Sequence, residues 1–114
     1  MASEAFKASL SANQRCLLEQ MQRLNFGRIE GLAVCNGEPH LDPPPRIVRE
    51  VKFMGENGSR RELGIKDFTL RKEVVEFFKE LGRLHNGIIE RVEVKHGLPF
   101  RMTIEDQPVR RDQY

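Results

Sequence analysis

The sequence has no tryptophan, one tyrosine and two cysteines. No apolar run in it approaches the roughly 18 residues that a membrane-spanning helix needs. Its first ten residues have neither the basic start nor the apolar centre of a signal peptide. Cys16 and Cys35 match neither a zinc pair nor a CxxC redox motif, so we interpret them as structural thiols. These absences predict a cytoplasmic protein with no membrane segment.

The chain also lacks a large excess of either positive or negative charge. The chain has 19 lysines and arginines against 17 aspartates and glutamates, which gives a net charge of +2 and a pI near 8.7. Dedicated nucleic-acid binders usually have a pI above about 9 with the charge gathered on one face. The overall charge therefore predicts only a weak positive field. A length of 114 residues fits a single domain over residues 1–114.

What the chain does contain is a repeat at an offset of sixty residues. The segment GRIEGLAVCNGEP, residues 27–39, aligns without a gap with GIIERVEVKHGLP, residues 87–99. Apolar stripes of helical period precede both segments at the same offset. Recurrence by chance near two hairpins is the alternative, and the number of identities disfavours it. The identical pairs are Gly27/Gly87, Ile29/Ile89, Glu30/Glu90, Val34/Val94, Gly37/Gly97 and Pro39/Pro99, and the aligned stripes are Leu17, Leu18, Met21 and Leu24 with Phe77, Phe78, Leu81 and Leu84.

We expect each repeat to fold as a helix followed by a β-hairpin. Ser11 and Gln14 have capping-box spacing, so the first helix should start near Ala12. Asp67 or Thr69 should cap the second helix, and the sequence does not decide between them. Strands are expected near residues 28–35, 47–54, 62–65, 88–95 and 100–105, with tight turns at 36–37 and 96–97.

The resulting fold class is α+β, an internally duplicated helix–β-hairpin in the order αββ(β)αββ. Because neither half can bury its apolar faces alone, we expect an antiparallel sheet with two helices on one face, related by an approximate two-fold axis. The repeats cover about residues 12–41 and 70–105, with a proline-rich connector at 42–46 and a solvated tail from residue 106. The predicted core is Leu18, Met21, Leu32, Val34, Phe78, Leu81, Val92 and Val94, and the last strand should turn Phe100, Met102 and Ile104 inward.

The first repeat resembles a known family. The run LLEQMQRLNFGRIEGLAVCNGEP is similar to the small bacterial YezD-like proteins, each about one helix plus one hairpin. The pattern is an apolar helix over 17–24, the pair Phe26-Gly27, alternating β-branched residues over 29–34 and a polar-glycine turn at 36–37. The second repeat has Asn86-Gly87 in place of the aromatic-glycine pair. The resemblance implies a duplicated bacterial unit and carries no established activity, and it leaves residues 43–68 without a counterpart.

Glu30 and Glu90 are the candidate catalytic residues. If the strands alternate strictly, both carboxylates share a face with inward apolar residues, which would raise their pKa and suit them to acid–base work. A bulge that turns Ile29 and Ile89 inward would instead leave both glutamates exposed. We favour the bulge or an ion-paired glutamate, since perturbed carboxylates also occur in structural pairs.

A mildly basic sheet face is the candidate binding surface. With the helices on one side, the open side should carry five basic residues opposed by Glu50, Glu93 and Glu105, and no aromatic residue there offers a stacking platform. A solvated face is the simpler interpretation. The basic residues are Arg46, Lys52, Arg91, Lys95 and Arg101.

These observations predict a non-enzymatic binding or self-association module. A homodimer is the simplest form, since the last strand has no proline after Pro99 to block its edge, and a partner protein is the other. The alternatives are weak nucleic-acid binding through the basic face and a small enzyme that uses Glu30 and Glu90. We expect no cofactor and no metal, because His40 and Asp42 lack further ligands at a zinc spacing.

Overall fold

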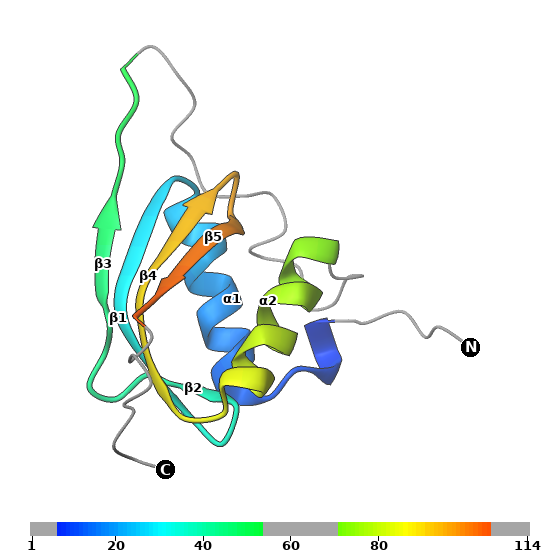
Figure 1. Cartoon of the computed structure of the whole chain (residues 1–114). Coiled ribbons are helices and arrows are strands. Elements are labelled where there is room, and N and C mark those ends of the chain that lie inside the picture. Colours follow the sequence, from blue (N-terminus) through cyan, green and yellow to red (C-terminus); the bar gives the residue numbers. More distant parts are fainter. Residues whose placement is uncertain (1–6, 54–70, 106–114) are drawn as a thin grey trace.

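The structure is a computed structural model that describes residues 7–53 and 71–105. It is α+β, with two helices and a five-stranded antiparallel sheet (Figure 1). A short 3-10 helix, η1 (Lys7–Ser9), precedes the first α-helix. The elements then follow in the order α1 (Ala12–Leu24), β1 (Gly27–Cys35), β2 (Glu38–His40), β3 (Arg46–Arg49), α2 (Lys72–Leu84), β4 (Gly87–Lys95) and β5 (Leu98–Ile104). Neither α-helix is long and apolar enough to cross a membrane, a finding limited to the described residues.

The two helices begin differently. The Ser11 side chain accepts a bond from the Gln14 N–H, and the Gln14 side chain accepts one from the Ser11 N–H, which confirms the predicted capping box. Helix α2 has Arg71 as its N-cap, with no side-chain cap bond. The prediction of Asp67 or Thr69 as the cap was therefore wrong, and both lie outside the described residues.

The sheet has the order β2–β1–β4–β5, and β3 also pairs with β1. Strand β1 pairs with β2 near its C-terminal end and with β3 near its start, so β2 and β3 share one edge of β1. The strand predicted over 47–54 is shorter than expected, because Val51 and Phe53 lie beyond β3 and are 58 % and 92 % exposed. The strand predicted near 62–65 lies outside the described residues.

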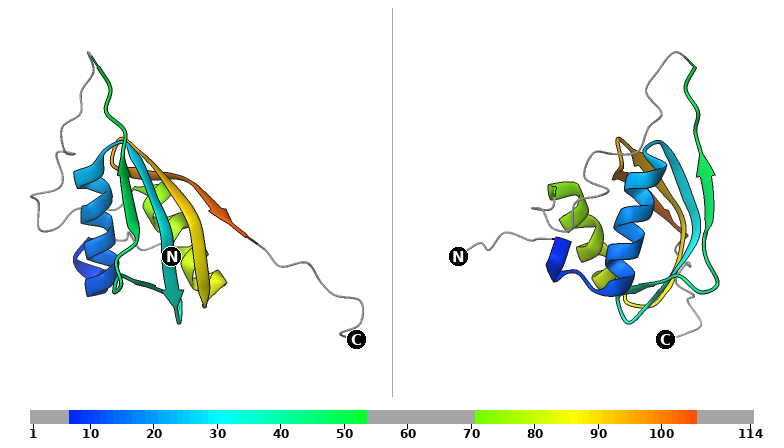
Figure 2. Two further views of the ribbon diagram at one scale, coloured as in Figure 1. Left: turned by 90° about the vertical axis from the view of Figure 1, so that its left-hand side faces the viewer. Right: turned by 180° about the vertical axis from the view of Figure 1, so that it is seen from behind.

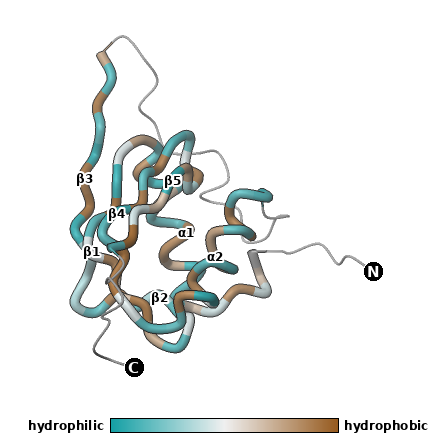
Figure 3. Tube along the Cα trace, viewed as in Figure 1, coloured by the Kyte–Doolittle hydropathy of each residue, from teal (hydrophilic) through white to brown (hydrophobic). Residues whose placement is uncertain are grey.

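Both helices cover the same face of the sheet (Figure 2). Hydrophobic and hydrophilic residues alternate along the helices and the central strands, as amphipathic elements require (Figure 3). The core forms between the inner stripes of α1 and α2 and the inward residues of β1 and β4. Its buried members are Leu17, Met21, Leu24, Ile29, Leu32, Val34, Phe77, Leu81, Ile89, Val92 and Val94, and Leu18 and Val74 form a smaller cluster beside it.

Two predicted core positions need correction. Phe78 is only partly buried, and Phe77 occupies the core, 5 % exposed. Phe100 is 55 % exposed rather than inward. The register of β4 with β5 shifts between Val94–Pro99 and Glu93–Arg101, so Phe100 is the extra residue of a bulge and turns away from the core. Met102 and Ile104 pack against the core as expected.

The described halves share their backbone details at the sixty-residue offset. Both helices have 13 residues, and the bounds of α1 and β1 fall sixty positions before those of α2 and β4. Positive φ angles recur at Asn25 and His85 and in the turns at 36–37 and 96–97. Gly37 donates its N–H to the His85 carbonyl at 2.7 Å, and Gly97 donates to the Asn25 carbonyl at 2.8 Å. Each hairpin turn is thus held by the end of the other half's helix.

Candidate functional site

Glu30 faces away from the core because β1 contains a kink. Ile29 and Leu32 are both fully buried although three positions apart, and Gly31 lies between them with φ of 69°. The pairing of β1 with β4 passes over Gly31 and Glu90, so both strands deviate at the same point. The structure therefore has the bulged arrangement, and strict alternation was wrong.

The outward Glu30 is held by arginines. Its Oε2 lies 2.7 Å from Arg28 Nε and its Oε1 lies 3.6 Å from Arg46 Nε. The hydrogen bond from Arg28 is the main reason that the Glu30 pKa is lowered. Desolvation, the second-largest influence, raises this pKa, and the charges of Arg28, Arg46 and Arg91 lower it further. Glu30 therefore stays ionised at neutral pH, which suits an ion pair and does not suit a general acid. Glu90 is exposed.

The five predicted basic residues do not form a uniform basic face. On the sheet, Glu30 lies between Arg46 and Arg91, and Glu93 lies between Arg28 and Arg101. Arg101 is 3.7 Å from Glu93, measured between Nη1 and Oε2. Each glutamate thus lies between two arginines, so this part of the face has four positive charges against two negative ones and is mildly positive rather than uniformly basic.

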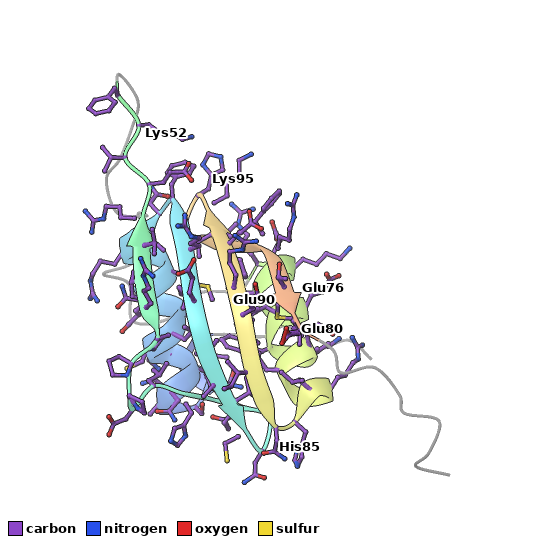
Figure 4. The ribbon with its side chains drawn as sticks, turned by 60° about the vertical axis from the view of Figure 1, so that its left-hand side comes forward. Lys52, Glu76, Glu80, His85, Glu90 and Lys95 are labelled. Atoms are coloured by element: carbon purple, nitrogen blue, oxygen red, sulfur yellow. The ribbon has the colours of Figure 1, made fainter. Side chains whose placement is uncertain are left out.

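The two predicted lysines lie near one end of the sheet, and His85 lies at the other (Figure 4). The ammonium of Lys52 is 3.9 Å from the centre of the Phe26 ring. The ammonium of Lys95 is 5.4 Å from the centre of the Phe100 ring. Phe26 also meets the His96 ring edge-on at 4.8 Å. Both lysines therefore lie beside aromatic rings at one end of the sheet and not at the centre of its open face.

A hollow between α2 and β5 was not predicted. It has a volume of about 360 Å³ and lies against the last strand of the sheet. Three carboxylates of α2 stand on one side of it, since positions i, i+3 and i+7 of a helix share a face, and apolar side chains make its floor. We call it the acidic groove; its lining residues are Glu73, Glu76, Glu80, Phe77, Pro99, Phe100, Arg101 and Met102.

The acidic groove adjoins an open strand edge. Within the described part of the chain, β5 pairs only with β4, so its other side has no strand partner. Glu76 and Glu80 extend from α2 on the side of β5 (Figure 4). A smaller hollow of about 170 Å³ continues past Phe100 toward the turn at 96–97. The groove and the edge together form one surface that an extended chain could occupy.

The corresponding place on α1 is occupied differently. A hollow of about 410 Å³ lies between α1 and the proline connector, and Pro44, Pro45 and Ile47 form part of its wall. The edge of β1 is covered by two short strands, β2 and β3, with the proline connector between them. The equivalent edge of β4 is covered by the single strand β5. Proline lacks an N–H, so the edge with the connector is the poorer template for strand pairing.

The described residues include two free cysteines and no cluster of metal ligands. Cys16 and Cys35 are both free and exposed. No group of three or more histidine, cysteine, aspartate or glutamate residues is placed to hold a metal ion within residues 7–53 and 71–105. The absence of a metal or cofactor stays a prediction.

Sequence signals for part of this site were present. Gly31 is an isolated glycine in a strand pattern, which often marks a bulge, and it would have turned Arg28 and Glu30 outward. The three glutamates of α2 have the spacing of one helix face. Their position beside β5 has no signal in the sequence, because it depends on how the helix packs on the sheet.

Comparison of the chain with protein-family models, with curated proteins and with solved structures finds no match. The resemblance to YezD-like proteins therefore stays a prediction.

Proposed function

We propose that the protein is a non-enzymatic association module that binds an extended polypeptide segment at the open edge of β5. The observation that carries this proposal is the coincidence of an unpaired antiparallel edge with the acidic groove beside it. Strand addition of this kind draws its affinity from main-chain hydrogen bonds and its specificity from pockets for alternate side chains. The homodimer expected from the sequence is one form of this association, with a second β5 as the added strand.

The pairing pattern identifies which backbone groups face the open edge. In a two-residue turn, Leu98 N–H bonds to the Lys95 carbonyl, and hydrogen-bonded and non-bonded pairs then alternate along the ladder. Arg91–Thr103 is thereby a bonded pair and Val92–Met102 a non-bonded pair. The Met102 N–H and carbonyl consequently point away from β4. The opposite edge of the sheet agrees with this assignment. Glu50 N–H bonds to the Phe26 carbonyl at 2.9 Å, and the alternation of bonded and non-bonded pairs from β3 through β1 and β4 again makes Val92–Met102 a non-bonded pair.

Replacing Met102 with proline should therefore remove the edge donor and keep the fold, because proline is tolerated where the N–H faces outward. The probes are seven-residue peptides in which valine alternates with lysine, glutamine or glutamate, together with a second copy of the protein. We expect M102P to weaken strand binding, or the dimer, at least about tenfold. Binding is measured by NMR titration and self-association by sedimentation.

Met102 also lines the groove, so one control is Met102→Ala, which removes that side chain but keeps the N–H and should bind more tightly than M102P. The other control is Ile47→Pro, which removes an outward N–H from the opposite edge and should leave binding unchanged. Circular dichroism establishes that all three variants stay folded. Thr103→Pro is unsuitable as the edge test because it removes a bond to β4 and should destabilise the sheet. Equal binding by M102P and the unmodified protein would rule out the β5 edge as the contact.

We also propose that the two halves arose by internal duplication of one helix–hairpin unit. The coincident helix bounds, the recurring positive φ angles and the reciprocal bonds between turns and helix ends support it. In this view each unit needs the other to bury its apolar face. An experimental structure in which residues 17–41 and 77–101 fail to superpose would contradict the proposal.

The two other functions have weaker support. Three of the four arginines on the sheet face are paired with Glu30 or Glu93, whereas a nucleic-acid backbone is bound by clustered cations. Salt-dependent retention on DNA or RNA would revive that function. Glu30 and Glu90 line none of the hollows described above, and Glu30 is engaged by arginines. A small enzyme that uses this pair is the least supported of the three.

A further inference from the structure

Two of the three carboxylates of the acidic groove are available to a ligand. Glu73 and Glu76 are exposed, and within residues 7–53 and 71–105 neither has an ion-pair partner. Glu80 pairs with Arg83 on the next turn of the helix. The chain as a whole has a net charge of +2, whereas the groove is lined by three glutamates and one arginine, Arg101. The excess of negative charge at the β5 edge is therefore a local feature.

A second β5 strand suits this site poorly. Two β5 edges paired across a two-fold axis would bring one α2 beside the other on the same face of the joined sheet. The carboxylates of both grooves would then share one seam, where like charges disfavour contact. The cation of β5 itself, Arg101, borders the groove, but its guanidinium already pairs with Glu93 at 3.7 Å.

We infer that the acidic groove takes an extended segment of a partner protein with lysine or arginine at alternate positions. This inference rests on the proposed strand addition at β5. Alternate residues of the added strand point to the helix side of the sheet, about 6.8 Å apart. Glu73 and Glu80 span roughly 10 Å along α2, so two or three long basic side chains reach all three carboxylates.

The groove floor and the outer face of β5 further restrict which residues the partner segment can have. The floor of the groove is apolar, with Phe77, Pro99 and Met102, and it accommodates the aliphatic stems of lysine or arginine. Side chains on the opposite side of the added strand lie toward Arg101 and Thr103, where neutral residues such as valine or threonine avoid repulsion. The partner segment therefore alternates basic with small or β-branched neutral residues.

The test compares the lysine–valine and glutamine–valine peptides, with blocked termini, by NMR titration of the protein. We expect the lysine peptide to bind about tenfold tighter, as several exposed ion pairs of modest strength imply, and its advantage to shrink at high salt. The double variant E73Q/E76Q should weaken lysine-peptide binding about fivefold. The matched control E50Q/E90Q removes two exposed carboxylates outside the groove and should leave the affinity unchanged.

The outcomes separate this inference from the proposed function. Equal binding of the two peptides, lost in both cases by M102P, would overturn the basic segment and retain strand addition. Tight lysine binding that E73Q/E76Q does not weaken would also overturn it, because the peptide would then bind elsewhere. A dimer that M102P dissociates, with no peptide bound, would make the second copy the occupant. A monomer of 13.2 kDa that binds no peptide would contradict both proposals.

Discussion

Replacing Phe77 with alanine should destabilise the protein by roughly 3–5 kcal/mol, because it empties a fully packed position between α2 and the sheet. Phe77 is 5 % exposed and belongs to the main core cluster. Phe78, its neighbour at 5.4 Å between ring centres, is only partly buried. Phe78→Ala should therefore cost less, about 1–3 kcal/mol. Urea unfolding of both variants measures the difference.

This pair of variants also tests the orientation of α2. The sequence predicted Phe78 as the core residue, although the apolar stripe of this helix contains Phe77 as well. A larger loss for Phe78→Ala than for Phe77→Ala would mean that α2 is rotated about its axis relative to the structure. The glutamates would then no longer face β5.

Replacing Gly27 with alanine should cost roughly 3 kcal/mol or more, because both its backbone and its surroundings exclude a side chain. Its φ is 151°, and an added Cβ would lie 2.1 Å from the backbone carbonyl oxygen of Val48 in β3. The strand or the turn before it would have to move. Thermal or urea unfolding of Gly27→Ala measures the cost.

Gly87 supplies the matched control at the equivalent place in the other half. It has a similar φ of 158°, but the nearest atom to an added Cβ is the flexible Leu84 side chain at 3.3 Å. Gly87→Ala should thus be the milder change by about 1 kcal/mol or more. Equal losses in the free energy of unfolding for Gly27→Ala and Gly87→Ala would contradict the close approach of β3 to Gly27.

The sequence predicted those helices, strands and turns that are supported both by a local sequence pattern and by the repeat at sixty residues. Both helices, the strands 27–35 and 87–95 and the two tight turns follow from apolar periodicity and from Asn36-Gly37 and His96-Gly97. The connector between the repeats was predicted less well. Residues 43–53 have no repeated counterpart, and the division of one edge into β2 and β3 depends on contacts with β1 that leave no pattern in the sequence.

The candidate site was predicted less completely than the fold, for a physical reason. Successive side chains alternate between the two faces of a sheet only while the strand is regular. The strands are irregular at Gly31 and at Phe100, so alternation in the sequence placed the neighbouring side chains on the wrong face. The first kink turned Glu30 out among arginines, and the second exposed Phe100. The acidic groove depends on the packing of α2 beside β5, which no local spacing encodes. The expectation of an open edge at the last strand was made from the sequence and underlies the proposed function.

Amide hydrogen exchange at adjacent residues of β5 tests the central claim most directly. In the free protein, Thr103 N–H should exchange slowly because it bonds to β4, and Met102 N–H should exchange fast because it faces the open edge. Saturation with the lysine–valine peptide should slow Met102 at least about tenfold and leave Thr103 unchanged. Met102 exchange that stays fast in a saturated complex would contradict strand addition at β5.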